Sequence, residues 1–407
     1  MKIMYVHNIL DTHFNSGAEA ILLEQITASK KQGHSCILVK LSDNKGLYHN
    51  SFNGVNEWHL GIKNIYWPFN KKKSFSPLKR FLWHLIDIYN IFIRRYIIHI
   101  VKIEQPDLVC IHNISGWSST IWNVFNELGI PTVQVLHDYY AICVKTTMYN
   151  NNQNCSNQCT RCHAFRFPHR KLSQNLQAVV GVSRYILEKH LSLGYFENVK
   201  IQRVIHNARS PTSLGLDMAH SPTLHQGLRF GFIGRLHPTK GISLLIEAFI
   251  AVDLTDTKLL IAGSGKEQFE AQLHSQIHNR SIQFLGRVTP RDFYPQVDVV
   301  VVPSLWHEPL GMVVAEALAF GKPVIASRRG GIPEMICHGE NGLLFEPDSP
   351  GELESALKAM CDDNLRTKLT AKARPSSLPF TDIDRWVSTY EALYQEVIAA
   401  HKRNPLI

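Results

Sequence analysis

Short apolar runs, rich in β-branched residues, recur along the whole chain with helical stretches between them. Each run has the length and composition of a strand that is buried on both faces of a parallel sheet. The runs are residues 2–7, 34–41, 107–113, 132–137 and 178–183 in the first half, and 228–233, 258–262, 282–285, 297–304 and 323–327 in the second. Helical periodicity follows several of them, at 18–32, 184–193 and 312–320. This alternation predicts an α/β protein built on doubly wound, Rossmann-like sheets.

The 407 residues of the chain are more than one ordinary hydrophobic core holds, so two domains are expected. Residues 210–227 contain two prolines, two glycines and no strong periodicity, which is typical of a linker. We therefore predict an N-terminal domain at 1–209 and a C-terminal domain at 228–381. A final amphipathic helix is predicted after residue 381. The first strand–helix–strand unit lacks a G-x-G-x-x-G loop, which argues against a dinucleotide site there.

The richest candidate chemistry lies around a predicted strand–loop–helix junction near residue 310. The start of such a helix presents unpaired backbone N–H groups to an anion, here near Gly311. Glu308 lies in the loop before the helix and Glu316 about one turn inside it, and carboxylates accept hydrogen bonds from paired sugar hydroxyls. Either glutamate alone is more often a favourable charge near a helix start. Together they predict a ligand with hydroxyls at both ends and phosphates in the middle, which describes a nucleotide sugar.

The junction resembles the E-x7-E signature of the retaining GT-B glycosyltransferases of family GT4, written here as Glu308-Pro-Leu-Gly-Met-Val-Val-Ala-Glu316. The Gly-Lys-Pro-Val segment at 321–324 and the Gly-Gly-Ile-Pro-Glu segment at 330–334 also match that family. The resemblance implies a GT-B fold, in which two Rossmann-like domains face a central cleft. It also implies that the terminal helix, 382–407, crosses back to the first domain, which lies on the acceptor side.

A second group of candidates follows the strand at 228–233. Arg235 supplies a planar guanidinium and Lys240 a mobile ammonium, and two cations at the mouth of a sheet suit a diphosphate. Exposed Arg and Lys side chains usually have no such role, but this pair matches the family's donor-diphosphate pair. Two further segments resemble those that pack around the nucleotide base, with Arg287 and Val288 as candidate contacts.

The resemblance assigns further roles in donor binding and catalysis. Glu308 would hold the hydroxyls of the sugar and Glu316 those of the ribose, with the donor also contacting the turn at Leu310, Gly311 and Met312. Together with Arg235 and Lys240, this helix start would offset the charge of the leaving diphosphate, so no metal is expected to be required for catalysis.

Two candidate sites come from the N-terminal half. His137 ends the strand at 132–137 and precedes Asp138, and polar residues at such strand ends build sites in α/β proteins. Taken alone, a histidine there is more often a hydrogen-bonded structural residue, but its match to the family's His-Asp loop implies that it orients the donor sugar. Gly17 and Ala18 match the family's Gly-Gly-Ala-Glu loop near the donor phosphates, with Ser16 in place of the first glycine.

The residues and the resemblance together predict a retaining hexosyltransferase. It would move a sugar from a UDP- or GDP-type donor to a saccharide or a lipid-linked saccharide in surface-polysaccharide assembly. An epimerase acting on nucleotide sugars would use the same donor site without an acceptor, and a non-catalytic module would bind the donor without turnover. A basic nucleic-acid-binding protein is a third alternative, but it leaves the two glutamates without a role, so nucleic acid is not an expected partner.

The positive charge of the chain lies in its first half. Residues 1–210 carry 24 Lys and Arg against 12 Asp and Glu, whereas residues 211–407 carry 19 against 22. In the first half, residues 65–101 interleave aromatic side chains with cations, and such a segment can lie on an anionic membrane surface. The cations of this segment include Lys71, Lys72, Lys73, Lys79, Arg80, Arg94 and Arg95.

The alternative for this segment is a solvated basic loop followed by a core helix with Arg94 and Arg95 on its wet side. No apolar run is long and uninterrupted enough for a transmembrane helix. We therefore expect a cytoplasmic protein, peripheral at the inner face of the cell membrane if the membrane interpretation holds.

Four cysteines gather in an asparagine-rich segment, which we treat as an insert at about 143–169. Their C-x11-C-x3-C-x2-C spacing, in an otherwise cytosolic-looking chain, favours a structural zinc. Reduced thiols without metal and a redox or disulfide role are the alternatives, and His163 and His169 are alternative ligands. Some bacterial members of the family carry a similar insert, which would form a lid on the acceptor side. The four candidate ligands are Cys143, Cys155, Cys159 and Cys162.

Overall fold

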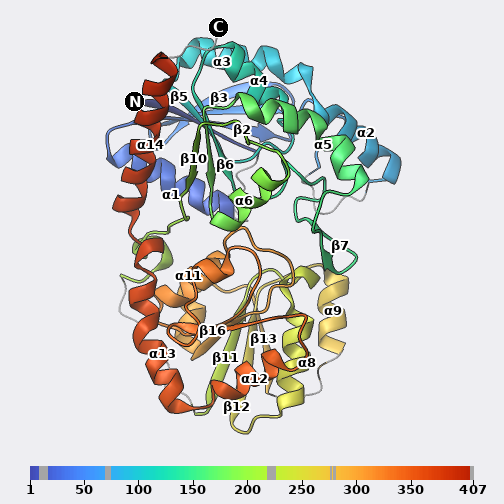
Figure 1. Cartoon of the computed structure of the whole chain (residues 1–407), viewed down its shortest axis with the longest axis vertical. Coiled ribbons are helices and arrows are strands. Elements are labelled where there is room, and N and C mark those ends of the chain that lie inside the picture. Colours follow the sequence, from blue (N-terminus) through green and yellow to red (C-terminus); the bar gives the residue numbers. More distant parts are fainter. Residues whose placement is uncertain (9–16, 69–74, 218–225, 276, 278–280, 404–407) are drawn as a thin grey trace. The chain divides into compact units, whose positions relative to one another are not determined.

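The structure is a computed structural model that describes residues 1–8, 17–68, 75–217, 226–275, 277 and 281–403. The chain divides into two compact units (Figure 1). The first unit comprises Met1–Met148, Cys155–Ile205 and Asp384–Ile407, and the second comprises Tyr149–Asn154 and His206–Ile383.

The first unit contains an eight-stranded sheet with the order β10-β9-β6-β5-β1-β2-β4-β3 in its described residues. Neighbouring strands are parallel, apart from an edge hairpin of β3 (Leu47–Phe52) and β4 (Val55–Gly61) that the sequence analysis did not predict. Three interior strands, β5, β6 and β9, are buried along their whole length, which explains their continuous apolar sequences. The other strands are β1 (Lys2–His7), β2 (Ser35–Ser42), β5 (Leu108–Ile111), β6 (Thr132–Leu136), β9 (Ala178–Gly181) and β10 (Ile201–Val204).

Helices cover this sheet, and the helix predicted near residue 184 begins as its sequence indicates. Ser183 accepts a hydrogen bond from the backbone N–H of Ile186 at 3.1 Å, which satisfies one of the orphan donors at the helix start. The terminal helix is tied to this unit by a hydrogen bond from Gln25 Nε2 to the hydroxyl of Tyr394 at 2.8 Å. The helices are α1 (Gly17–Lys31), α2 (Pro77–Ile88), α3 (Arg94–Glu104), α4 (Thr120–Glu127), α5 (Thr160–Leu172), α6 (Arg184–Ser192) and α14 (Ile383–Arg403).

The second unit contains a parallel sheet with the order β13-β12-β11-β14-β15-β16 in its described residues. Its strands are β11 (Leu228–Ile233), β12 (Thr257–Ala262), β13 (Ile282–Gly286), β14 (Val299–Val302), β15 (Val324–Ser327) and β16 (Gly342–Phe345). Its helices are α7 (Pro211–Leu214), α8 (Ile242–Val252), α9 (Glu267–Ser275), α10 (Pro290–Phe293), α11 (Met312–Ala319), α12 (Glu352–Ala359) and α13 (Asp363–Ser376).

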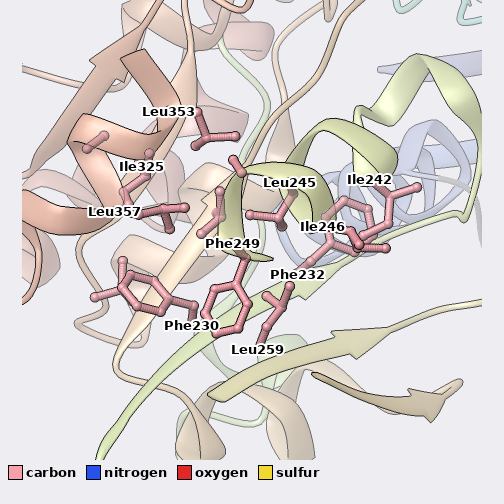
Figure 2. Close-up of a cluster of buried hydrophobic side chains, with 14 of the residues drawn as sticks. Phe230, Phe232, Ile242, Leu245, Ile246, Phe249, Leu259, Ile325, Leu353 and Leu357 are labelled. Carbon is pink, nitrogen blue, oxygen red and sulfur yellow. The ribbon is translucent and has the colours of Figure 1, made fainter. Parts of the chain in front are cut away.

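One face of this sheet is held by the apolar cluster in Figure 2. Phe230 of β11, Phe249 of α8, Ile325 of β15 and Leu357 of α12 are each at most 3% exposed. Burying such a side chain stabilises the fold by about 1.5–3 kcal/mol relative to leaving it in water. The cluster therefore fixes the central strands, and with them the loops that leave their carboxyl ends.

Both sheets have a topological switch point beside their first strand. Chain order reverses between β1 and β5 in the first unit, and between β11 and β14 in the second. At such a point the loops after the two strands diverge to opposite faces of the sheet, which is where α/β proteins bind ligands. The candidates of the second unit follow from this topology, since Arg235 and Lys240 come after β11 and Glu308 comes after β14.

The observed boundaries differ from the predicted ones in two places. The change of unit between Ile205 and His206 precedes the expected linker at 210–227, of which 218–225 lies outside the described residues. A short hairpin of β7 (Tyr149–Asn150) and β8 (Gln153–Asn154), inside the expected cysteine-rich insert, groups with the second unit. Within that unit the Asn154 side chain donates to the carbonyl of Leu305 at 2.7 Å and accepts from the backbone N–H of His307 at 3.0 Å.

Candidate active site

The carboxylate of Glu308 is almost fully buried in the loop that follows β14. One of its oxygens, Oε1, accepts three hydrogen bonds, from Lys240 Nζ at 2.6 Å, Ser304 Oγ at 2.6 Å and Trp306 Nε1 at 2.8 Å. The described residues provide no hydrogen-bond donor to the other oxygen, Oε2. The side chain is therefore fixed through Oε1, while Oε2 can accept a hydrogen bond from a ligand hydroxyl.

The Gly-Gly-Ile-Pro-Glu segment holds this loop in place. The backbone N–H of Gly331 donates to the carbonyl of Glu308 at 2.8 Å, and that of Gly330 donates to His307 Nδ1 at 3.0 Å. Gly330 has φ +61°, and a Cβ there would lie 2.0 Å from the Glu308 carbonyl oxygen. Only glycine fits so close to the loop in this conformation. The segment that matches the family thus serves to position Glu308.

The two predicted cations of the β11 loop have different surroundings. Lys240 uses one of its N–H groups for Glu308, which leaves two for an anion. Arg235 is exposed, and no described residue forms a hydrogen bond or an ion pair with it. The loops after β11 and β14 are joined by a bond from the Leu305 N–H to the Thr239 carbonyl at 2.8 Å. The structure therefore brings Lys240 and Glu308 into one site, with Arg235 on the same loop as Lys240.

The helix start that was predicted near residue 311 is present. Gly311 precedes α11 with φ +95°, in the left-handed region, and Leu310 before it is buried. Gly311 and Met312 are half-buried. The first N–H groups of a helix have no acceptor inside the helix, so this turn offers donors to an anion.

Glu316 is half-buried on α11, and the described residues engage both of its oxygens. Arg209 Nη1 donates to Oε1 at 3.0 Å, and the Tyr294 hydroxyl donates to Oε2 at 3.3 Å. Burial raises the pKa of the Glu316 carboxyl, against the lowering effect of the Arg209 guanidinium. The sequence analysis missed both partners, because each lies far from Glu316 along the chain and neither belongs to a recognised motif.

The candidate base contacts follow β13, next to the β12 loop. Arg287 is exposed and donates from Nε to Ser264 Oγ at 2.5 Å. Val288 is half-buried. Since β12 and β13 are adjacent parallel strands, these residues lie at the same edge of the sheet as the loops that carry Lys240 and Glu308.

In the first unit, His137 pairs with a second histidine that the sequence analysis did not single out. His112 Nδ1 and His137 Nε2 are 2.9 Å apart, and the two rings stack with their centroids 5.0 Å apart. Burial, with a smaller contribution from nearby His7, lowers the pKa of His137 to about 3. The imidazole is therefore neutral at physiological pH and acts as a hydrogen-bonding group rather than as a cation.

Asp138 is fixed beside it by two donors. Asn113 Nδ2 donates to Oδ2 at 2.9 Å, and the backbone N–H of Tyr140 donates to Oδ1 at 2.8 Å. Burial raises the pKa of Asp138 to about 6. His112 and Asn113 directly follow β5, and their only sequence signal was polar character at the end of an apolar run.

The glycine-containing loop of the first unit is described only in part. Gly17 begins α1 and is exposed, and Ala18 is half-buried. The preceding loop, including Ser16, lies outside the described residues. The expected contact of Gly17 and Ala18 with the donor stays a prediction.

The structure brings the clustered cysteines near one another, with Cys159 beside Cys162 and Cys155 within electrostatic range of Cys143. The sulfur atoms of Cys143 and Cys162 are 3.9 Å apart, and all four cysteines are free thiols. A disulfide requires about 2.05 Å, whereas two sulfurs on one tetrahedral zinc at about 2.3 Å from the metal lie about 3.8 Å apart. Among the described residues, however, no three His, Cys, Asp or Glu side chains are grouped so as to hold a metal ion. Zinc therefore stays a prediction, supported by one sulfur–sulfur distance.

The models of two protein families match the chain, and together they span most of it. "Glycosyl transferases group 1" matches residues 220–375, and "Glycosyltransferase Family 4" matches residues 15–211. An uncharacterized 42.6 kDa protein in the cps region of Klebsiella pneumoniae is 30% identical over 335 residues, which is 82% of this chain and 87% of that protein. The N-acetyl-alpha-D-glucosaminyl L-malate synthase of Bacillus anthracis is 32% identical over 43% of this chain and 47% of the enzyme.

Solved structures share the fold at low sequence identity. The Anabaena protein Alr3699/HepE, in complex with UDP and glucose, superposes with a TM-score of 0.69 at 18% identity, over 97% of this chain and 99% of that one. Sucrose-phosphate synthase from Thermosynechococcus elongatus superposes with a TM-score of 0.73 at 17% identity, over 98% of this chain and 99% of that one. The fold is thus the GT-B fold, with two Rossmann-like domains. With both halves matched and a relative 30% identical over most of its length, the chain belongs to the group 1, family 4 glycosyltransferases.

Proposed function

We propose that this glycosyltransferase transfers a hexosyl group from a nucleotide sugar, with retention of the anomeric configuration, to a saccharide or a lipid-linked saccharide. The observation that carries the proposal is the state of Glu308. Its carboxylate is held through Oε1 by Lys240, Ser304 and Trp306, Oε2 has no donor among the described residues, and the helix start at Gly311 follows three residues later. A fixed acceptor beside cationic and N–H donors suits the junction between a sugar and a diphosphate.

In the proposed reaction the bond between the anomeric carbon and the diphosphate oxygen breaks, and a bond to the acceptor oxygen forms on the same face. The acceptor's hydroxyl proton passes to the leaving diphosphate, which departs as the nucleoside diphosphate. Negative charge grows on the diphosphate as its bond breaks. That charge would be stabilised by the two remaining N–H groups of Lys240, the exposed guanidinium of Arg235 and the first amides of α11, around Leu310, Gly311 and Met312.

The roles of the other candidates follow from their surroundings. Glu308 Oε2 would accept hydrogen bonds from the hydroxyls of the sugar. Glu316 would accept hydrogen bonds from the hydroxyls of the ribose, on the same oxygens that already accept from Arg209 and Tyr294. Arg287 and Val288 would contact the base. Each of these roles is expected to affect affinity for the donor.

His137 would orient the donor sugar rather than transfer a proton. A histidine whose pKa has fallen to about 3 is a weak base at physiological pH, but it still donates from one ring nitrogen and accepts at the other. Since His112 occupies Nε2, the nitrogen left for a ligand is Nδ1. Gly17 and Ala18, at the start of α1, would lie near the donor phosphates.

Two of the related proteins bear on the donor and the pathway. The Anabaena protein has been solved with UDP and with UDP-glucose, which supports UDP over GDP as the donor nucleotide. The Klebsiella protein is described as lying in a cps region, which supports a role in surface-polysaccharide assembly. We infer that the protein works in the cytoplasm, at the inner face of the membrane. None of the helices within the described ranges is both long and apolar enough to cross a bilayer.

A thermal-shift panel of UDP-, GDP- and ADP-sugars, run in EDTA, tests the donor site. Ligand at about 100 times its dissociation constant should add about 2.7 kcal/mol of stability to the wild-type protein. Glu308→Gln and Glu316→Ala should lose most of that shift, while Glu340→Gln, an exposed glutamate in the same unit, should keep it. A shift that needs added divalent metal would contradict metal-independent binding, and no shift with any nucleotide sugar would contradict the proposed donor site.

Retention is tested separately on the product. With the stabilising donor and a saccharide acceptor, the anomeric configuration of the new linkage is read from NMR coupling constants. An inverted linkage would overturn the same-face mechanism without affecting the donor assignment. Epimerised nucleotide sugar, formed without an acceptor, would show that the enzyme is an epimerase instead.

A further inference from the structure

Helix α2 presents its apolar stripe to solvent. Leu78, Phe81, Leu82 and Leu85 stand at i, i+3, i+4 and i+7, the spacing of side chains along one face of a helix. They are 67%, 44%, 42% and 44% exposed. In an ordinary surface helix this stripe would pack on the core. Here it lies on the outside.

The opposite face of α2 is buried and fixes the rotation of the helix. Trp83 is 3% exposed and donates from Nε1 to the carbonyl of Tyr66 at 3.2 Å. Asp87 is fully buried and accepts a hydrogen bond from the hydroxyl of Tyr140. Turning the leucines inward would break both contacts, because Trp83 and Asp87 lie on the other side of the helix. The outward stripe is therefore built into the fold.

The exposed apolar surface continues beyond α2 into the turn that precedes α3. Seven of the fifteen large apolar side chains exposed in the described residues fall within these fifteen positions, so the exposure is concentrated and not scattered. Contiguous exposed apolar surface of this kind marks a binding surface. We call it the α2 apolar face, and its members are Leu78, Phe81, Leu82, Leu85, Tyr89, Ile91 and Phe92.

The exposed charge along the segment that carries the α2 apolar face is positive, and the nearby exposed acid Glu127 is paired with Arg94. Between Glu57 and Glu104 the sequence contains nine Lys and Arg, and Asp87, which is buried, is its only acid. Exposed cations lie close to the face along the chain, Lys79 and Arg80 in the first turn of α2 and Arg95 at the start of α3. Apolar and aromatic side chains bordered by cations match the surface of an anionic bilayer, which offers acyl chains below a layer of phosphates.

We propose that the α2 apolar face docks on an anionic lipid bilayer, with its leucines and aromatic rings at the boundary between headgroups and acyl chains. The charge argues against a second copy of this chain as the partner, because a symmetric contact would oppose like charges. It also argues against nucleic acid, for which the apolar stripe would have no use. Helix α2 packs beside α5 within the first unit (Figure 1), so docking would bring this unit to the membrane.

The inference extends the proposed function by naming where the acceptor is met. Only that extension rests on glycosyl transfer, since docking itself needs no donor and no turnover. It also separates the two alternatives for the basic aromatic segment along the chain. α3 is the core helix, with Ile97 and Ile100 buried and Arg94 and Arg95 exposed, whereas α2 is the membrane-facing helix.

Vesicle flotation with the full chain, without nucleotide sugar, tests the proposal. The probes are vesicles of phosphatidylcholine alone and of phosphatidylcholine with phosphatidylglycerol, at low and at high salt. Wild-type protein should float with the anionic vesicles at low salt, and the double change Leu78→Gln with Leu82→Gln should weaken binding about tenfold or more. The control change Phe52→Gln, an exposed ring on β3 of the same unit, should bind as wild type does.

A charge variant and a mass measurement complete the test. Lys71, Lys72 and Lys73 lie outside the described residues, so the charge variant changes the exposed Lys79, Arg80 and Arg95 to Gln, which should weaken binding to anionic vesicles and reduce its salt dependence. Activity on a short soluble acceptor should be unchanged in every variant, which separates failure of docking from failure of catalysis. Wild-type protein that stays unbound, or a double variant that still floats, would overturn the proposal. A wild-type dimer that the double variant abolishes would instead identify a second copy as the occupant.

Discussion

Replacing Glu308 by Gln and by Ala separates the structural role of its Oε1 from the chemical role of its Oε2. The glutamine amide oxygen can still accept from Lys240, Ser304 and Trp306, so the loop keeps its three hydrogen bonds but loses the negative charge. In Glu308→Ala, the donors Lys240, Ser304 and Trp306 lose the Glu308 oxygen as their acceptor. The two variants therefore differ in hydrogen bonding more than in charge.

The contacts set the expected magnitudes. Hydrogen bonds to a charged group are worth about 1.5–3 kcal/mol and neutral ones about 0.5–1.5 kcal/mol. Lys240 is partly exposed, which weakens its ion pair, so Glu308→Gln should lower the free energy of unfolding by about 1–2 kcal/mol. Glu308→Ala removes the Glu308 acceptor from the buried Ser304 hydroxyl and from Trp306 Nε1, at about 1–3 kcal/mol each, and should cost about 3–5 kcal/mol in total.

Turnover should also fall in both variants, for a reason that is separate from the loss of stability. Gln places an NH2 group where Oε2 stood, so an acceptor for sugar hydroxyls becomes a donor, and the rate should drop about a hundredfold. Chemical denaturation and turnover of the stabilising donor are measured side by side, with Glu340→Gln as the exposed control. Equal loss of stability in the Gln and Ala variants would refute Oε1 as a shared acceptor. Wild-type turnover in the Gln variant would refute the role of Oε2.

Three further predictions follow from other parts of the molecule. The change His112→Phe keeps the stacked ring but removes the hydrogen bond to His137, so turnover should fall about tenfold at similar KM. The ¹⁵N chemical shifts of the His137 ring should also report a changed tautomer. Unchanged shifts would contradict the pairing of the two histidines. Burial raises the pKa of Asp87 from 3.8 to about 7, so its carboxyl binds a proton more readily in the folded state than in the unfolded state. The free energy of unfolding, relative to that of Asp87→Asn, should therefore fall by up to about 4 kcal/mol as the pH rises from about 4 to 7. The same pH dependence of the unfolding free energy in both proteins would contradict this. If the clustered cysteines hold zinc, elemental analysis should find about one zinc per chain, lost in Cys143→Ser with Cys162→Ser but kept in Cys361→Ser; metal-free protein would leave reduced thiols.

Much of the fold could be predicted because its signals are local. The apolar runs at 2–7 and 228–233 coincide with β1 and β11, and the helix expected at 312–320 is α11 at Met312–Ala319. Fully buried parallel strands and short amphipathic helices each show a characteristic hydrophobic pattern in adjacent residues. The edge hairpin of β3 and β4 was missed because β3 is mostly exposed and polar, so it has no apolar run.

The candidate site could be predicted in its members but only partly in its contacts. Glu308 and Lys240 were both named, yet no local rule indicates that residues 68 positions apart form a hydrogen bond. The same holds for Glu316 with Arg209, and for His137 with His112. Lys240 meets Glu308, and His112 meets His137, because neighbouring parallel strands bring their carboxyl ends to one edge of a sheet, whatever their separation in sequence. Arg209 instead reaches Glu316 from the segment that precedes β11.

The sequence by itself contains the amphipathic spacing of residues 77–88, because helical spacing is a local property, although the sequence analysis treated this stretch only as part of a basic aromatic segment. Which side of that helix faces water was decided only by the tertiary structure. Trp83 and Asp87 find their partners in Tyr66 and Tyr140, and those contacts hold the stripe outward. A periodic pattern specifies that two faces differ, whereas the face that is buried depends on which distant segments supply hydrogen bonds and packing to it.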